Sequence, residues 1–217
     1  KKRTNVKKVV IIPNAITYPI AVNEPKVSPE VSNDHCLSLI AVGRLAAQKG
    51  FERLLCAFAE LAPRFPEWHL TILGEGDSRD VLDALRLKLN LEKRVSLPGV
   101  VGNLGEWYAS ADLFVMTSLF EGFPNTLTEA MAYGLPVVSV DCDTGPRDII
   151  RHQIDGVLVP QNDQVALVEA LAALMRDKAL RDQYASSAIE IRERLSIERV
   201  AGMWEKVFIE ISKKDEL

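Results

Sequence analysis

Two glutamates eight positions apart, Glu121 and Glu129, are the residues of this chain whose type and spacing best suit chemistry at a ligand. The run between them is rich in turn formers and ends where a helical pattern begins. Asn125 is a favourable N-cap residue, so we expect a helix that starts there and presents unpaired backbone N–H groups. Because the positive end of a helix dipole attracts phosphate, the run predicts an anion site between two carboxylates.

Each glutamate also has alternative explanations. Thr126 and Glu129 have the spacing of a capping box, in which Glu129 would only bond an unpaired backbone N–H. Glu121 would then be a solvated loop acid, and taken alone either glutamate is better explained by such a structural role. A further alternative is a glycosidase, in which the two carboxylates serve as acid and nucleophile.

A second set of chemically useful residues lies earlier in the chain, in the run Gly43-Arg44-x4-Lys49-Gly50. Arg44 and Lys49 follow an apolar run and precede a helical pattern. Surface cations are usually only solvated, but a guanidinium fork can grip phosphate oxygens and an ammonium adds a compact charge. The two cations therefore predict a phosphate clamp at the end of a strand.

The elements that must position these residues alternate along the chain. Short apolar runs typical of buried strands occur at residues 37–42, 70–73, 95–97, 112–116, 137–140 and 156–160. Helical patterns lie between them, so we expect an α/β fold with a Rossmann-like parallel sheet and helices on both faces. The carboxyl ends of its strands share one edge, where ligands bind. The glycines Gly74 and Gly76 follow the second run, and we expect a steric role for them rather than a dinucleotide motif.

The two ends of the chain differ from this alternating part. Residues 9–12 are rich in β-branched side chains and predict a strand, although no partner strand is obvious nearby. Residues 17–34 contain three prolines and two asparagines, which is typical of a linker. Three helical patterns follow residue 160, and we expect their apolar stripes, including Val200, Trp204 and Phe208, to pack in the core.

Composition and charge exclude several functions. The chain has 217 residues, of which 47% are hydrophobic and 26% charged, with a net charge of −4. It therefore lacks the basic field of a nucleic-acid-binding protein, and no apolar run reaches membrane-spanning length. The three cysteines, Cys36, Cys56 and Cys142, are odd in number and predict buried free thiols in the cytoplasm. The final Lys-Asp-Glu-Leu matches a retention signal, which we interpret as a chance ending because no secretory signal is visible.

Together these motifs resemble those of one family. The run from Glu121 to Glu129 is similar to the Glu-x7-Glu motif of retaining, nucleotide-sugar-dependent glycosyltransferases of family 4, and Gly-Arg-x4-Lys-Gly is similar to their diphosphate loop. Residues 145–150 resemble their Gly-Pro-x-Glu-Ile-Ile, with Asp148 in place of the glutamate and its role left open. The resemblance covers the chain from Val10 onward and implies the carboxyl-terminal lobe of the two-lobed GT-B fold.

The resemblance implies a role for each matching residue. Glu121 would lie beside the donor sugar, Glu129 would bind the ribose hydroxyls, and Glu121, Arg44 and Lys49 would form the catalytic set. The expected donor-binding residues are Gly43, Arg44, Lys49, Val101, Gly122, Phe123, Asn125, Thr126, Leu127 and Glu129. GT-B enzymes neutralise the diphosphate without a metal, so we do not interpret the Asp-x-Asp triplet at Asp141 and Asp143 as a metal site.

The resemblance also implies a division of labour. Residues 1–34 would be the end of a missing amino-terminal lobe and a linker, and residues 35–217 would bind a nucleoside-diphosphate sugar. We expect a UDP-sugar, with a GDP-sugar as the open alternative, no cofactor, and a glycan or lipid-linked acceptor held by the missing lobe. The whole protein would be a hexosyl- or N-acetylhexosaminyltransferase in the cytoplasm or at the inner face of the membrane.

Two further expectations concern this chain by itself. The fragment alone would be inactive, and part of the face around Trp204 would lack the first lobe as its partner. The alternative outside the enzymes is a nucleotide-binding module without catalysis.

Overall fold

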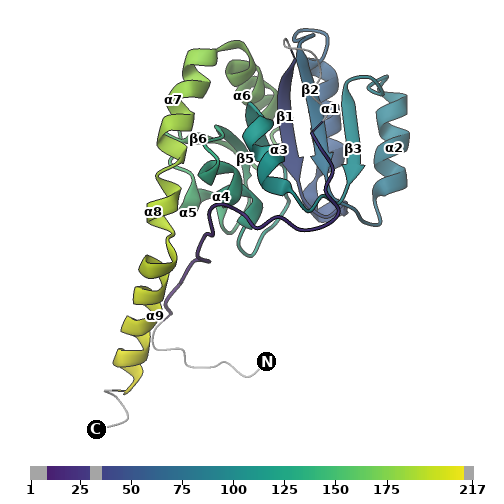
Figure 1. The fold of residues 1–217 in the computed structure, drawn as a ribbon. Coiled ribbons are helices and arrows are strands. Elements are labelled where there is room, and N and C mark those ends of the chain that lie inside the picture. Colours follow the sequence, from purple (N-terminus) through teal and green to yellow (C-terminus); the bar gives the residue numbers. More distant parts are fainter. Residues whose placement is uncertain (1–8, 30–35, 213–217) are drawn as a thin grey trace, which may run out of the picture.

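A parallel sheet of six strands forms the centre of the computed structural model, which describes residues 9–29 and 36–212 (Figure 1). The strands are β1 (Leu37–Val42), β2 (Trp68–Leu73), β3 (Val95–Gly99), β4 (Leu113–Met116), β5 (Val137–Asp141) and β6 (Gly156–Pro160). All six were predicted, and their ends differ by at most two residues. The expected boundary between residues 34 and 35 and the final residues 214–217 lie outside the described part of the chain.

The order of the strands is β3-β2-β1-β4-β5-β6, and every neighbouring pair is parallel. The chain builds outward from β1 to β3, then returns to place β4 on the other side of β1, with Leu39 opposite Leu113. Open α/β sheets bind ligands where the order reverses in this way. The loops that follow β1 and β4 meet at this point. The first carries Arg44 and Lys49, the second carries Glu121, and Glu129 lies in the helix that follows the second loop.

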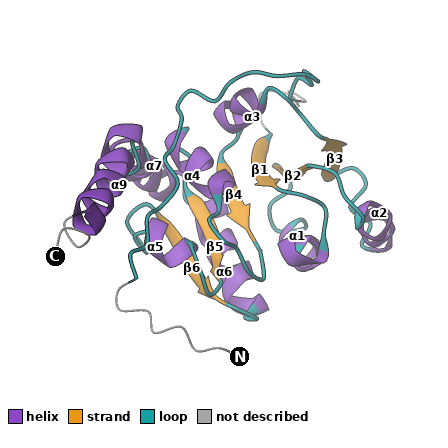
Figure 2. Ribbon diagram, turned by 90° about the horizontal axis from the view of Figure 1, so that it is seen from below, coloured by secondary structure: helices purple, strands orange, loops and turns teal. Residues whose placement is uncertain are grey.

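Helices cover both faces of the sheet, so the predicted Rossmann-like architecture is confirmed (Figure 2). One face carries α1 (Phe51–Leu61), α2 (Arg79–Lys88) and α6 (Gln164–Arg176), and the other carries α3 (Leu104–Ser110), α4 (Asn125–Ala132), α5 (Pro146–Ile149) and α8 (Ile191–Arg194). The helix α7 (Lys178–Ala188) contributes to both cores. Phe58 and Tyr108 are fully buried on opposite faces, and burial of such a side chain stabilises the fold by about 1.5–3 kcal/mol.

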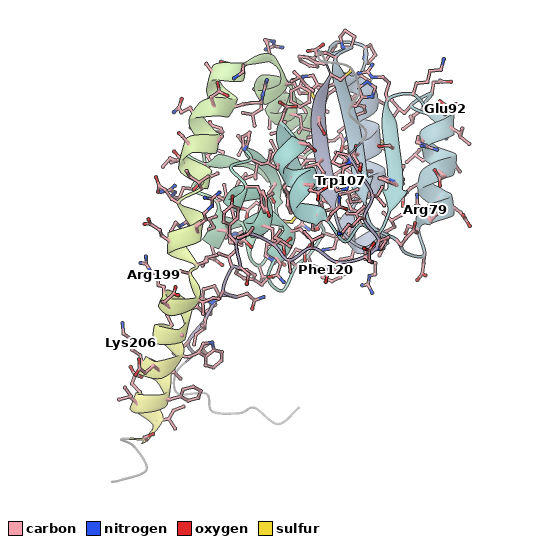
Figure 3. All side chains as sticks on the ribbon, in the orientation of Figure 1. Arg79, Glu92, Trp107, Phe120, Arg199 and Lys206 are labelled. Carbon is pink, nitrogen blue, oxygen red and sulfur yellow. The ribbon has the colours of Figure 1, made fainter. Side chains whose placement is uncertain are left out.

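Residues 9–29 form no helix or strand and lie along α3 and α4 (Figure 1). The N–H of Ile16 donates to the Leu195 carbonyl at 2.8 Å, and the N–H of Ile20 donates to the Tyr133 hydroxyl at 3.1 Å. Further along, the indole N–H of Trp107 donates to the Val27 carbonyl at 2.8 Å (Figure 3). This amino-terminal segment is therefore attached to the body of the fold from Ile16 to Val27.

The strand predicted at residues 9–12 is wrong. These residues have no regular structure, and Val9 and Ile11 are largely exposed. A β-branched run favours an extended backbone, but a strand also needs a neighbour for its N–H and C=O groups. No strand in residues 9–29 or 36–212 lies beside this run to supply one.

The predicted core packing is also wrong for the last helix, α9 (Ile197–Ser212), which projects away from the sheet (Figure 1). Val200 is the one residue of α9 that is buried, whereas Trp204 and Phe208 are 48% and 59% exposed. An amphipathic stripe is buried only where another surface covers it. The exposed Trp204 agrees instead with the expectation that this face lacks a partner within this chain.

The three cysteines are free, and they differ in burial. Cys142 is buried and Cys36 is half-buried, but Cys56 is exposed on α1, so the prediction of buried thiols is wrong for it. Cys56 lies four residues from Glu52 and from Glu60, on the outer stripe of the helix.

The helices give no sign of a membrane span. Within residues 9–29 and 36–212, none of them combines the length and the apolar character that crossing a bilayer requires.

Candidate functional site

Glycines allow the ends of β1 and β2 to approach each other closely. The N–H of Gly43 donates to the Leu73 carbonyl at 2.9 Å. Gly74 has a φ of +135°, and a Cβ there would collide with the Gly43 carbonyl oxygen. A Cβ on Gly76 would collide with the Leu45 carbonyl in the same way. The steric role expected for these two glycines is confirmed.

The loop after β1 is tied to the loop after β4. It ends in a short 3₁₀ helix, η1 (Ala47–Lys49), and Gly50 follows in a left-handed conformation with φ +65°. The Thr117 hydroxyl donates to the Lys49 carbonyl at 2.9 Å, and the N–H of Leu119 donates to the Gln48 carbonyl at 2.7 Å. Residues that are about seventy positions apart therefore form one structural unit at the carboxyl edge of the sheet.

This unit brings together two of the predicted site residues. The Lys49 ammonium lies 2.6 Å from Oε1 of Glu121, and the Ser118 hydroxyl donates to the same oxygen at 2.6 Å. The side chains of Lys49 and Glu121 are 20% and 8% exposed, so water screens the pair less than a surface ion pair. The second oxygen of Glu121 accepts no hydrogen bond from the described residues, which leaves it available to a ligand hydroxyl.

Arg44, the other predicted cation, is exposed at the start of the same loop. Its guanidinium makes no hydrogen bond or ion pair with residues 9–29 or 36–212. Its planar set of donors is therefore available to an anion.

The start of α4 differs from the prediction by one residue. Pro124 occupies the N-cap position, and Asn125 is the first residue of the helix. The prediction that Asn125 caps the helix is therefore wrong, because its N–H already turns back to the Phe123 carbonyl at 3.0 Å. Its side-chain oxygen instead accepts a hydrogen bond at 3.0 Å from the Asn14 amide of the amino-terminal segment.

Three backbone N–H groups were expected to face a diphosphate, and they differ in availability. Those of Asn125 and Leu127 donate within the turn, the second to the Pro124 carbonyl at 3.1 Å. The N–H of Thr126 donates to none of the described residues. Leu127 is fully buried, so only its backbone can meet a ligand. Thr126 therefore offers the freest donor at this helix end.

Glu129 lies one turn further into α4 and has a different environment. Its Oε2 accepts a hydrogen bond at 3.2 Å from the hydroxyl of Tyr108, which is fully buried. No side chain caps the start of α4, so the capping-box alternative is wrong. Burial raises the pKa of the Glu129 carboxyl, and the hydrogen bond from Tyr108 offsets part of this rise.

The loop after β5 packs against the segment that carries Glu121 and Pro124. The Thr144 hydroxyl donates to the Glu121 carbonyl, and a Cβ on Gly145 would collide with the Pro124 ring. Asp141 accepts a hydrogen bond from Arg147 at 2.9 Å, which occupies one member of the Asp-x-Asp triplet. No group of histidine, cysteine and acidic residues within 9–29 and 36–212 is arranged to hold a metal ion.

The remaining predicted site residues are spread around this centre. Gly122 is exposed in open space, and the half-buried Phe123 packs against the core beneath α4. Val101 precedes Gly102, whose N–H donates to the Pro25 carbonyl at 2.6 Å. The amino-terminal segment therefore holds the loop in which a nucleobase was expected.

Several residues that build the site were not predicted from the sequence. Ser118 and Thr144 bond to Glu121, and Tyr108 bonds to Glu129. A buried tyrosine usually finds a partner for its hydroxyl, so Tyr108 could have been suspected once its helix was placed against the core. The two hydroxyl residues gave no comparable signal. Phe120, which is exposed beside Glu121 at the carboxyl edge, gave none either (Figure 3).

Comparison with known proteins assigns a family. Residues 25–191 match the family described as glycosyl transferases group 1. An exopolysaccharide phosphotransferase of Streptomyces coelicolor is 38% identical over 181 residues, which cover 82% of this chain and 19% of that protein.

Two solved structures illustrate the fold. A TarM mutant of S. aureus, crystallised with UDP among its ligands, has a TM-score of 0.81 at 23% identity, over 94% of this chain and 40% of its own. The carboxyl-terminal domain of a group 1 glycosyl transferase of Francisella tularensis has a TM-score of 0.68 at 24% identity, over 74% of this chain and 87% of that domain.

The family match covers the part of the chain that carries the sequence motifs. The matched range includes β1 to β6 and both loops of the site. The chain spans less than half the length of the curated relatives that it matches first, namely 19%, 48% and 49%. The chain belongs to the group 1 glycosyltransferases, and its fold is that of the carboxyl-terminal domain of a GT-B glycosyltransferase.

Proposed function

We propose that this chain binds the nucleoside-diphosphate sugar of a retaining glycosyltransferase, and that the donor is a UDP-sugar. The observation that carries the proposal is the Lys49–Glu121 pair at 2.6 Å, held where the strand order reverses. Two loops that bring a cation against a carboxylate suit a ligand with both a diphosphate and a sugar. UDP is preferred because the TarM structure contains it.

Departure of the diphosphate from the sugar is the difficult part of such a reaction, because negative charge grows on the leaving oxygen. Preorganised donors stabilise that charge. Arg44, Lys49 and the N–H of Thr126 are the donors available here. Lys49 has three N–H groups, so it can keep Glu121 and still bind a phosphate oxygen. No metal is needed in this arrangement.

Two carboxylates complete the proposed site. Glu121 would orient the donor sugar through its second oxygen, while Lys49 and Ser118 hold its first oxygen in place. Glu129 would accept hydrogen bonds from the ribose hydroxyls. The Val101 loop would contact the base, and the backbone of Gly43, Gly122, Phe123, Asn125 and Leu127 would line the path between sugar and base.

The whole protein's activity is part of the same proposal. Residues 1–34 would lead from an acceptor-binding lobe, and residues 35–217 would supply the donor. A glycan or lipid-linked acceptor would receive a hexose or N-acetylhexosamine. The free thiols of Cys36, Cys56 and Cys142 suit a reducing compartment, so we propose a cytoplasmic location, with contact to the inner membrane face through the whole protein.

Calorimetry with UDP and with GDP, in EDTA, tests the proposal directly. We expect binding of UDP without any metal, because the cations, the helix end and Glu129 all belong to this chain. A folded protein that binds neither nucleotide would refute the proposed donor site. Binding without transfer in the full-length protein would instead favour the non-catalytic module.

A further inference from the structure

Three tyrosine rings connect the amino-terminal segment to Glu129. The Tyr18 ring meets the Tyr133 ring edge-on at 5.0 Å, and the Tyr133 ring lies 5.7 Å from that of Tyr108. The Tyr108 hydroxyl then reaches Oε2 of Glu129 at 3.2 Å. Arg192 lies 3.6 Å above the Tyr18 ring and closes the outer end of the column. The carboxylate therefore lies at the inner end of a row of three packed tyrosine rings.

The hydroxyl of Tyr108 is placed to brace the first turn of α4. It lies 3.2 Å from the Thr126 carbonyl and 3.2 Å from Glu129. A phenol has one proton to donate, and a carboxylate is the stronger acceptor. Burial raises the pKa of Tyr108 well above its usual value, so the hydroxyl stays protonated as a donor. The ring has no freedom to move away, because it is fully buried against Phe114 at 6.2 Å.

We propose that Tyr108 is a positioning residue, whose hydroxyl holds the Glu129 carboxylate in the orientation that accepts the ribose hydroxyls. The inference rests on the proposed role of Glu129 in donor binding. A glutamate side chain has three rotatable bonds. Among the described residues, the Tyr108 hydroxyl is the hydrogen-bond partner of the half-buried Glu129 carboxylate, so this bond fixes the orientation of the carboxylate. Fixing it before the ligand arrives removes an ordering cost from binding.

The test compares UDP with 2′,3′-dideoxy-UDP, which lacks both ribose hydroxyls, on wild type and on Tyr108→Phe. This substitution keeps the ring and removes only the hydroxyl. We expect UDP affinity to fall about 5- to 10-fold, the equivalent of one ordinary hydrogen bond, while dideoxy-UDP affinity is unchanged. The discrimination between the two nucleotides should therefore shrink. Glu129→Gln serves as the reference for complete loss of this discrimination.

The pH dependence provides a second readout. Among the described residues, burial and the Tyr108 hydroxyl are the causes that act on the pKa of Glu129, and only the hydroxyl lowers it. Tyr133, at the other end of α4, acts on the Tyr108 hydroxyl and leaves the carboxylate untouched. In Tyr108→Phe, the pH at which UDP affinity is lost on acidification should move upward.

Two tyrosines serve as controls. Tyr184→Phe removes a buried hydroxyl in α7, on the opposite core, and should leave both affinities unchanged. Tyr133→Phe removes the acceptor of the Ile20 N–H but keeps the stacked ring, so it should retain the discrimination.

The possible results distinguish the positioning role of Tyr108 from the ribose-binding role of Glu129. A Tyr108→Phe protein that loses affinity for both nucleotides equally would show a purely structural role and overturn the inference. Unchanged discrimination would overturn it as well, with the ribose role of Glu129 still standing. If wild type itself binds UDP and dideoxy-UDP equally, the ribose role fails, and the inference with it.

Discussion

The two glutamates of one motif are in different electrostatic states. Glu121 is matched by the ammonium of Lys49 at 2.6 Å, so its charge is compensated within the protein. Glu129 has a neutral tyrosine hydroxyl as its partner, and burial raises its pKa. Glu129, whose hydrogen-bond partner among the described residues is a hydroxyl, therefore gains more than Glu121 from a ligand that donates hydrogen bonds to it.

The raised pKa of Glu129 predicts a pH-dependent stability. The folded protein binds the proton of this carboxyl more tightly than the unfolded chain does, so the group's contribution to stability falls as pH rises from the ordinary value of 4.5 through the folded pKa. Glu129→Gln removes the buried charge and can still accept from Tyr108. We expect its melting temperature to exceed that of wild type at neutral pH and to match it below pH 4.5. A lower melting temperature at neutral pH would contradict the prediction.

Arg44→Ala should weaken UDP binding and leave stability unchanged. The guanidinium is exposed and has no partner among the described residues, so its removal disturbs no contact of the fold. The expected loss of affinity is about 1.5–3 kcal/mol, the usual value for a hydrogen bond to a charged group. Uridine, which lacks the diphosphate, should bind the variant and wild type alike. Arg199→Ala, in the distant α9, is the matched control (Figure 3).

Lys49→Ala should differ from Arg44→Ala by lowering stability as well as affinity. Its loss leaves the carboxylate of Glu121 unpaired at 8% exposure, and an uncompensated charge of this kind is costly. Urea unfolding of the two variants measures the contrast. Equal stabilities would show that Ser118 alone satisfies Glu121.

The close approach of β1 and β2 positions the loop that carries Arg44 and Lys49. Gly74→Ala puts a Cβ against the Gly43 carbonyl at a φ of +135°. We expect it to lower the free energy of unfolding by at least about 1–3 kcal/mol, the cost of a strained backbone alone. Gly202→Ala in α9 meets nothing within 4 Å, and it should raise helix stability by roughly 0.5–1 kcal/mol. Chemical denaturation of both variants checks the pair, and equal effects would contradict the steric argument.

The sequence predicted the elements well where local pattern determines them. The bounds of residues 37–42 and 156–160 are those of β1 and β6, because glycine or proline ends each apolar run. Residues 9–12 failed as a strand because strand formation depends on a partner. The stripe of α9 failed as core for the same kind of reason, since a stripe does not reveal what covers it.

The site could be predicted only in part. Motif spacing identified the loops that carry Lys49 and Glu121, and the strand order brings those loops together. Motif spacing could not predict that Lys49 pairs with Glu121, because this contact depends on how the two loops fold against each other. It also could not predict that Tyr108 reaches Glu129, because this contact depends on how α3 and α4 pack on the sheet. The capping-box alternative failed because α4 already begins at Asn125, so Thr126 lies inside the helix and is not its N-cap residue.

In the whole molecule, the proposed donor site, the amino-terminal segment and helix α9 lie toward the same end (Figure 1). The loops of the site, residues 9–20 and α9 all extend beyond the carboxyl edge of the sheet (Figure 1). Asn14 connects the amino-terminal segment to the start of α4, because its side-chain amide donates to the Asn125 side-chain oxygen at 3.0 Å. A second lobe or a partner protein that approaches this edge would therefore contact the proposed donor site and the amino-terminal segment together.

We predict that the 217-residue chain alone binds the donor and does not transfer its sugar. Transfer requires an acceptor held against the reacting carbon, and correct positioning of two reactants is worth up to about 7–11 kcal/mol of the barrier. In the proposed site, Arg44, Lys49 and the N–H of Thr126 would stabilise the leaving diphosphate, and the proposed second lobe would hold the acceptor. Water reaches the open edge, so slow hydrolysis of the donor is the largest activity expected. The measurement is a rate of sugar transfer for this chain and for the full-length protein, with the same donor and acceptor. A rate for the chain near that of the full-length protein would show that the acceptor site lies within these residues, and the role proposed for a second lobe would then be wrong.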